Sequence, residues 1–114
     1  FYDELIYKKH LKDVKNIFKI SKSKNSKTIF LVMPILNSIK TSQENYINFF
    51  KKNFFMICNK GDLFIDISML LDNTSLDKLV VNKFDYHASS YVNKLIAKEI
   101  YSALKDKSLN AEKC

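Results

Sequence analysis

The stretch TIFLVMPIL, residues 28–36, decides the fold of this chain. Its apolar residues run from Ile29 to a stop at Pro34, and they do not alternate with polar ones. A strand that is apolar on both faces is buried on both faces, which is typical of a parallel sheet with helices on either side. The stretch therefore predicts a buried strand of an α/β domain.

Helical patterns flank this strand on both sides. Residues 3–21 carry apolar side chains at helical spacing, and the stretch SKSKNSK at 21–27 then reads as a loop. Thr41 and Glu44 fit a capping box, so a second helix is expected after them, with Gly61 as its C-terminal cap. The apolar faces consist of Tyr7, Leu11, Val14, Ile17 and Phe18 in the first helix and of Tyr46, Phe49, Phe50, Phe54 and Ile57 in the second.

The second half of the chain repeats the alternation. LFIDI at 63–67 predicts a second short strand, and KLVV at 78–81 offers a short third one. Ser89 or Ser90 can cap a last helix, after which the polar tail is expected to fray. The inner face of that helix is predicted to be Val92, Leu95, Ile96, Ile100, Ala103 and Leu104.

The resulting order of helix, strand, helix, strand, loop and helix predicts an α/β fold. We expect part of a doubly wound, flavodoxin-like three-layer sandwich with a short parallel sheet. Two or three strands are few for such a sheet, since three helices offer apolar faces to it. We therefore expect residues 1–106 to be the C-terminal portion of a larger domain, followed by a polar tail at 107–114.

Composition excludes several classes of function. The 114 residues suffice for one small domain, and no apolar run approaches the roughly 20 residues of a membrane-spanning helix. The start FYDELIYKKH does not resemble a signal peptide, and with no initiator Met we expect a processed or partial chain. The net charge of +7 suggests nucleic acid, but all 19 basic residues are dispersed lysines. Without the bidentate fork of arginine, nucleic-acid binding is disfavoured.

Cysteine and histidine are too sparse to predict a metal or cofactor site. Cys58 lies within a helical apolar pattern and is expected in the core, whereas Cys114 ends the polar tail, so no disulfide framework is predicted. His10 and His87 are the two histidines, and they are far apart in the sequence. No Cys/His cluster has zinc spacing, so we expect neither metal nor cofactor.

The segment FDYHASS, residues 84–90, carries the candidate chemistry. Asp85 and His87 stand two residues apart between the last strand-like segment and the last helix, at the end of the sheet where open α/β folds bind ligands. In a Ser-His-Asp system, His accepts the nucleophile's proton while Asp fixes the imidazole tautomer. Asp-x-His also arises by chance and Asp is common before helices, so a structural hydrogen bond is the alternative.

The surrounding block KFDYHASSYVNKLIAKEIYSAL, residues 83–104, resembles the C-terminal block of SGNH (GDSL-type) hydrolases. In that family, Asp and His precede a last helix that VNKLIAKEI at 92–100 matches closely. The upstream stretches TIFLVMPI and GDLFIDIS also resemble family strands, so the likeness covers about residues 5–104. Ala88 and Ser89 depart from the family's usual Pro and Asn.

The resemblance implies a serine ester hydrolase acting on an ester, such as an acylated carbohydrate or lipid. His87 would be the general base and then the general acid, and Asp85 would orient it. The family's nucleophile and oxyanion donors lie upstream of the matched region, so this chain alone is not expected to hydrolyse esters. Ser38 and Ser68 follow the predicted strands but lack a nucleophile's context.

Two polar residues are given structural interpretations. Asp66, at the end of a predicted strand, is expected to cap the next loop, and His10 to be solvated.

The alternative for the whole chain is a non-catalytic α/β binding module or a degenerate relative of the family. In that case Asp85 and His87 would form only a structural hydrogen bond.

Overall fold

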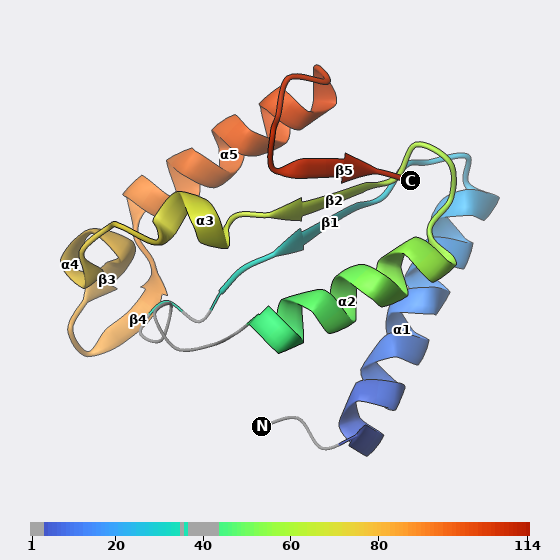
Figure 1. The fold of residues 1–114 in the computed structure, drawn as a ribbon, viewed down its shortest axis with the longest axis horizontal. Coiled ribbons are helices and arrows are strands. Elements are labelled where there is room, and N and C mark those ends of the chain that lie inside the picture. The colour runs from blue at the N-terminus through green and yellow to red at the C-terminus, as the bar shows by residue number, and fades with distance from the viewer. Residues whose placement is uncertain (1–3, 35, 37–43) are drawn as a thin grey trace.

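The chain is built of helices and short strands (Figure 1). The computed structural model describes residues 4–34, 36 and 44–114, and the side chains of 44–46 lie outside this description, as does Thr41 of the predicted capping box. The elements are α1 (Glu4–Ser23), β1 (Ile29–Val32), α2 (Glu44–Ile57), β2 (Leu63–Asp66), α3 (Ser68–Leu71), α4 (Leu76–Leu79), β3 (Val80–Asn82), β4 (Asp85–Ala88), α5 (Ser90–Leu104) and β5 (Ala111–Lys113).

The main sheet is small and mixed, with strand order β1-β2-β5. β1 and β2 run parallel with Ile29 opposite Leu63, whereas β5 pairs antiparallel to β2 with Lys113 opposite Leu63. The α/β class is therefore confirmed. The expectation of a parallel sheet holds for β1 and β2 only, because the chain returns antiparallel to β2 soon after α5.

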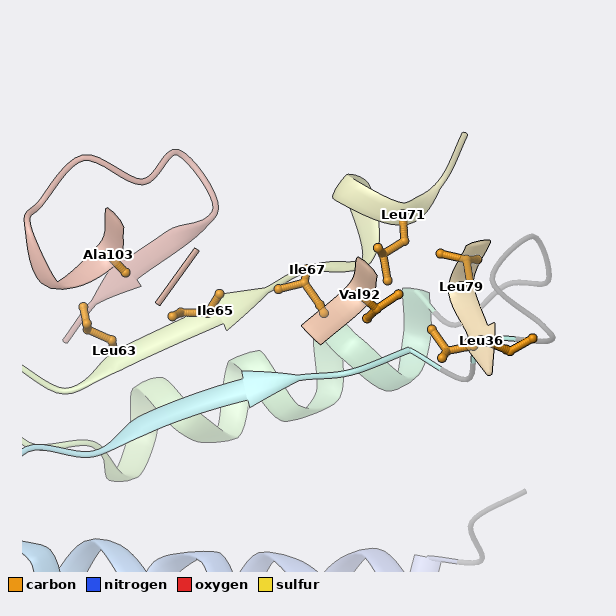
Figure 2. Close-up of a cluster of buried hydrophobic side chains, with 9 residues drawn as sticks. Leu36, Leu63, Ile65, Ile67, Leu71, Leu79, Val92 and Ala103 are labelled. Carbon is orange, nitrogen blue, oxygen red and sulfur yellow. The ribbon is translucent and has the colours of Figure 1, made fainter. Parts of the chain in front are cut away.

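Helices cover both faces of the β1–β2 pair, as the run of apolar residues requires. Leu63 and Ile65 of β2 belong to a core shared with Val92 and Ala103 of α5 (Figure 2). Phe64, between them, belongs to a second core with residues of α1 and α2. Successive side chains of a strand point to opposite faces, so both faces of β2 are buried.

Aromatic rings fill the core on the α1 and α2 side. The rings of Phe30 and Phe64 are stacked with centroids 5.7 Å apart, which links β1 to β2. Phe54 of α2 lies 5.4 Å from Phe64 and 5.7 Å from Phe18 of α1. Phe18, Phe54 and Phe64 are all buried, which confirms the predicted apolar faces at these positions.

The narrow sheet covers only part of each predicted helix face. Val14 and Phe18 of α1 are buried, but Ile17 is 56% exposed. In α5, Val92 and Ala103 are buried, whereas Leu104 is 61% exposed. Both exposures contradict the predicted inner faces, because helical spacing alone does not reveal how wide a stripe the neighbouring layer covers.

His10 was expected to be solvated, and this is wrong. Its side chain is half-buried in α1, with its ring centroid 5.2 Å from that of Phe50 in α2. Helix α2 brings a phenylalanine to a face of α1 that the charge pattern of α1 marks as polar. His10 thereby contributes to the contact between the two helices.

The C-terminal segment is ordered, which contradicts the expected fraying of the tail. Residues 111–113 form β5, and Cys114 is joined to Cys58 by a disulfide bond across a separation of 56 residues. The prediction that the two cysteines make no disulfide framework is therefore wrong. Cys58 directly follows α2 and Cys114 directly follows β5, so the bond ties the last strand to the end of a helix.

The turn before β2 is built on Gly61 and Asp62 rather than on a helix cap. Helix α2 ends at Ile57, and Gly61 has a φ of +91°, a conformation that favours glycine in a tight turn. The fully buried carboxylate of Asp62 accepts hydrogen bonds from the backbone N–H of Thr28 at 2.9 Å and of Asn59 at 2.7 Å. Asp62 thus links the start of β2 to the residue before β1 and to the segment that follows α2.

A separate two-stranded sheet, the β3–β4 hairpin, lies beyond the carboxyl ends of β1 and β2 (Figure 1). The third strand suggested for 78–81 therefore begins at Val80, after α4, and pairs with β4 rather than with the main sheet. Val80 and Leu79 are buried in the core that contains Ile67 and Val92, which attaches the hairpin to the domain.

No helix among the described residues is long and apolar enough to cross a bilayer.

Candidate active site

Asp85 and His87 both lie on β4, the second strand of the hairpin. This strand runs directly into the capping residue of α5, Ser89, whose side-chain oxygen accepts from the N–H of Val92 at 3.3 Å. The pair therefore precedes the last helix as expected, on the side of the molecule toward which β1 and β2 point (Figure 1). They stand on a strand of a separate hairpin rather than on a loop of the main sheet.

The two side chains face each other. Oδ1 of Asp85 accepts a hydrogen bond from the backbone N–H of His87 at 3.0 Å, and the same oxygen contacts Nδ1 of the His87 ring. Both groups are open to solvent, with 45% of the Asp85 side chain and 90% of the His87 side chain exposed. The pair is therefore neither separated nor sealed beneath other side chains.

This contact fixes which nitrogen of neutral His87 carries the proton. An ionised carboxylate can only accept, so Nδ1 facing Asp85 must be the donor in neutral imidazole. Nε2 then holds the lone pair, and it belongs to a ring that is 90% exposed. When Nε2 takes up a proton, the imidazolium remains paired with the carboxylate of Asp85.

The electrostatics of the pair follow from the same hydrogen bonds. The backbone N–H of His87, and after it the His87 side chain, lowers the pKa of Asp85 below its ordinary value. Hydrogen bonds donated to a carboxylate favour its charged form. Asp85 is therefore ionised at neutral pH, which is the state needed to orient an imidazole.

An irregularity in the hairpin lies next to the pair. Val80 is opposite Ala88 and Asn82 is opposite Asp85, so one residue of β3, Val81, faces two residues of β4, one of which is His87. Such a bulge inserts an extra residue, bends the strand and re-aims the neighbouring side chains.

An open pocket of about 670 Å³ borders the same hairpin. Val80 and Val81 of β3 and Ser89, Ser90 and Tyr91 at the start of α5 contribute to its lining. Val81 is also opposite His87 in the bulge, so one residue of the pocket lining neighbours the dyad. The volume lies within the roughly 300–1,000 Å³ of small-molecule sites.

Asp66 has the structural role expected for it. Its Oδ1 accepts from the backbone N–H of Ser68 at 2.9 Å and from the Ser68 hydroxyl at 2.7 Å, which caps the turn after β2. Ser68 is therefore engaged away from the dyad, and Ser38 lies outside the described residues. Within the described residues, no serine hydroxyl bonds to the His87 ring, whose recorded partner is Asp85.

No metal site emerges from the part of the chain that the structure describes. Within it, no group of three or more His, Cys, Asp and Glu side chains is arranged to hold a metal ion.

One polar residue of this region was missed by the sequence reasoning. Oδ1 of Asn82 accepts from the backbone N–H of Phe84 at 2.8 Å and of Asp85 at 2.9 Å. Asn is a preferred residue where a side chain caps its own turn two or three residues on. The letters NKFD, residues 82–85, contain this signal, which marks the turn between β3 and β4.

Comparison of the chain with protein-family models, with curated proteins and with solved structures found no match. The functional interpretation therefore stands on the residues of the chain and on their geometry.

Proposed function

We propose that this chain supplies the Asp85–His87 part of a Ser-His-Asp relay in an ester hydrolase of the SGNH type. The observation that carries the proposal is the contact between Oδ1 of Asp85 and Nδ1 of His87 in a solvent-open position. The nucleophilic hydroxyl and the oxyanion donors would come from a segment outside this chain. Acylated carbohydrates or lipids are the proposed substrates, and no cofactor or metal takes part.

In the proposed reaction, Nε2 of His87 carries every proton transfer. Nε2 of His87 would take the proton of the serine hydroxyl as its oxygen attacks the ester carbonyl carbon. The carbonyl carbon's bond to the alcohol oxygen then breaks, and Nε2 returns the proton to that oxygen. In the second half, Nε2 takes a proton from water as the water oxygen attacks the acyl carbon. The bond from that carbon to the serine oxygen then breaks, Nε2 gives the proton to the serine oxygen, and the carboxylic acid is released.

Asp85 would act on His87 throughout the cycle without taking the proton itself. It holds Nδ1–H in place when the imidazole is neutral and stabilises the imidazolium when Nε2 is protonated. Its lowered pKa supports this role, because a protonated Asp85 would no longer offer a negative charge to the ring. The adjacent pocket, with Val80, Val81 and Tyr91 in its lining, could receive the apolar part of an ester.

The test is hydrolysis of a small chromogenic ester by the natural protein that carries this chain. His87→Ala is expected to lower kcat/KM by about 10³-fold or more, as loss of a catalytic base does in serine hydrolases. His10→Ala is the matched control, because His10 is the other histidine and packs on Phe50 away from the hairpin. Hydrolysis at the unaltered rate by His87→Ala would favour the non-catalytic binding module instead.

A further inference from the structure

We infer that Asn82 is a positioning residue for the dyad, because it fixes the start of β4 and thereby holds the Asp85 carboxylate against the His87 ring. The inference deepens the proposed function, on which its catalytic consequence rests. Its structural part, the effect of Asn82 on the ring of His87, can be tested without any activity.

Two successive side-chain caps connect Asn82 to His87. Oδ1 of Asn82 accepts from the backbone N–H groups of Phe84 and Asp85, at 2.8 and 2.9 Å. Oδ1 of Asp85 in turn accepts from the backbone N–H of His87, at 3.0 Å, and contacts its ring. The first cap sets the backbone of Asp85, and the second sets both backbone and ring of His87.

The hairpin needs such caps because little else constrains its outer end. β3 has three residues and β4 has four, and an isolated two-stranded hairpin is marginal in water. The base of the hairpin is fixed where the backbone N–H of Ser89 donates to the carbonyl of Leu79 at 2.9 Å. At the other end, Phe84 is 85% exposed and gives no anchorage in the core.

The bulge makes the position of this outer cap important for the dyad. Between the pair formed by Val80 and Ala88 and the pair formed by Asn82 and Asp85, β4 has one residue more than β3. A strand with an extra residue can lose it by shifting its register, and a shift of one residue sends alternate side chains to the opposite face. Since Asp85 and His87 are two residues apart on one strand, such a shift would carry both side chains to the opposite face of the hairpin. By holding Asp85 opposite itself, Asn82 keeps the register in which His87 is opposite Val81.

The experiment measures the tautomer of the His87 ring by ¹⁵N NMR in the whole chain at a pH where the ring is neutral. In the unaltered protein we expect the proton on Nδ1. In Asn82→Ala the preference should fall to that of Asp85→Ala, which lacks the carboxylate. Lys83→Ala is the control in the same turn, and it should keep the original tautomer. The Lys83 side chain lies over the Phe84 ring and caps no backbone group among the described residues.

A second pair of variants decides the matter if Asn82→Ala disturbs the fold beyond the hairpin. Asn82→Asp keeps an acceptor oxygen at the same distance from the backbone and should keep the tautomer. Asn82→Gln carries the same amide one methylene further out and should lose the preference for a proton on Nδ1 of His87. An original tautomer ratio in both Asn82→Ala and Asn82→Gln would overturn the inference.

Activity separates this inference from the proposed function. In the natural protein, Asn82→Ala should lower kcat about tenfold with KM unchanged, because the Asp85 carboxylate would no longer be held against the His87 ring, and Asn82→Asp should restore kcat. A tenfold fall corresponds to about 1.4 kcal/mol in the activation free energy. If His87→Ala leaves hydrolysis intact while Asn82→Ala still shifts the tautomer, the proposed function fails and the positioning role stands. If His87→Ala abolishes hydrolysis but Asn82→Ala changes neither tautomer nor kcat, the positioning role fails alone.

Discussion

Two aspartates, one before β2 of the main sheet and one on the separate hairpin, use the same hydrogen-bonding chemistry in opposite environments. Asp62, before β2, is fully buried and divides its oxygens between the N–H groups of Thr28 and Asn59. Asp85, on the outer hairpin, uses one oxygen for the N–H of His87 and for the His87 ring, and 45% of its side chain is exposed. The first carboxylate is fully committed to backbone, whereas the second holds a titratable ring in solvent.

The comparison teaches where stability and chemistry reside in this molecule. Three links gather at the amino end of β2. They are the disulfide between Cys58 and Cys114, the buried carboxylate of Asp62, and the hydrogen bond from the backbone N–H of Cys114 to the Asp62 carbonyl at 2.8 Å. The outer end of the hairpin is held by exposed local caps, which cost little to break. A proposed reactive group is thus mounted on a part of the fold whose alteration should spare the core.

The disulfide is expected to have the largest effect on stability. Replacing Cys58 and Cys114 together by Ser removes a cross-link between residues 56 positions apart. The loop-closure entropy regained by the unfolded chain should lower the free energy of unfolding by about 4 kcal/mol. Denaturant unfolding of the double variant, compared with the oxidised parent, measures this loss. Reduction of the disulfide in the unaltered protein should reproduce this loss. An unchanged denaturation midpoint in both the double variant and the reduced protein would contradict a stabilising role of the disulfide.

The buried carboxylate comes next. Asp62→Ala leaves the N–H groups of Thr28 and Asn59 without an acceptor, so we expect a loss of about 3 kcal/mol in the free energy of unfolding. Asp62→Asn is the matched control, because its single amide oxygen can still serve one of the two donors, and it should lose less. Equal losses in both variants would argue against the two-donor account.

The exposed carboxylate should matter little for global stability. Asp85→Ala removes hydrogen bonds that water can replace, so its denaturation midpoint should stay at that of the unaltered protein within experimental error. The same denaturant experiment as for Asp62→Ala makes the contrast direct. A loss as large as that of Asp62→Ala would show that the hairpin is part of the cooperative core.

The smallest predicted effect is a shift in one titration. The N–H and ring of His87 lower the pKa of Asp85, so its contact with His87 is present above the ordinary pKa of Asp and is lost as pH falls through the lowered value. The ¹³C carboxyl signal of Asp85 should therefore titrate below the ordinary value. In His87→Ala the pKa should rise because the ring's hydrogen bond is gone, although the backbone N–H remains.

Sequence patterns predicted the buried parts of the fold well because burial on both faces leaves a strong apolar signal. TIFLVMPIL and LFIDI became β1 and β2, and Ser89 caps α5 as expected. The patterns failed for β5 and the disulfide, because AEK at 111–113 has no apolar period and Cys58 and Cys114 are 56 residues apart. Long-range pairing of this kind is invisible to local patterns.

The candidate site was predictable in its residues but not in its setting. Asp85 and His87 face each other, as the spacing of two residues on one strand allows, yet the hairpin that carries them was not predicted. β3 and β4 are short, and the bulge opposite Val81 interrupts the alternation that would have marked them. Asn82, which caps the turn, could have been found from its place at the start of NKFD.

The measurement that tests the central claim most directly is the tautomer of His87 in the unaltered chain, from the ¹⁵N shifts and couplings of its ring above the pH at which the ring becomes neutral. The geometry predicts a proton on Nδ1, toward Asp85, and a bare Nε2. A proton found mainly on Nε2, or a tautomer ratio equal to that of Asp85→Ala, would contradict the dyad and the function proposed from it.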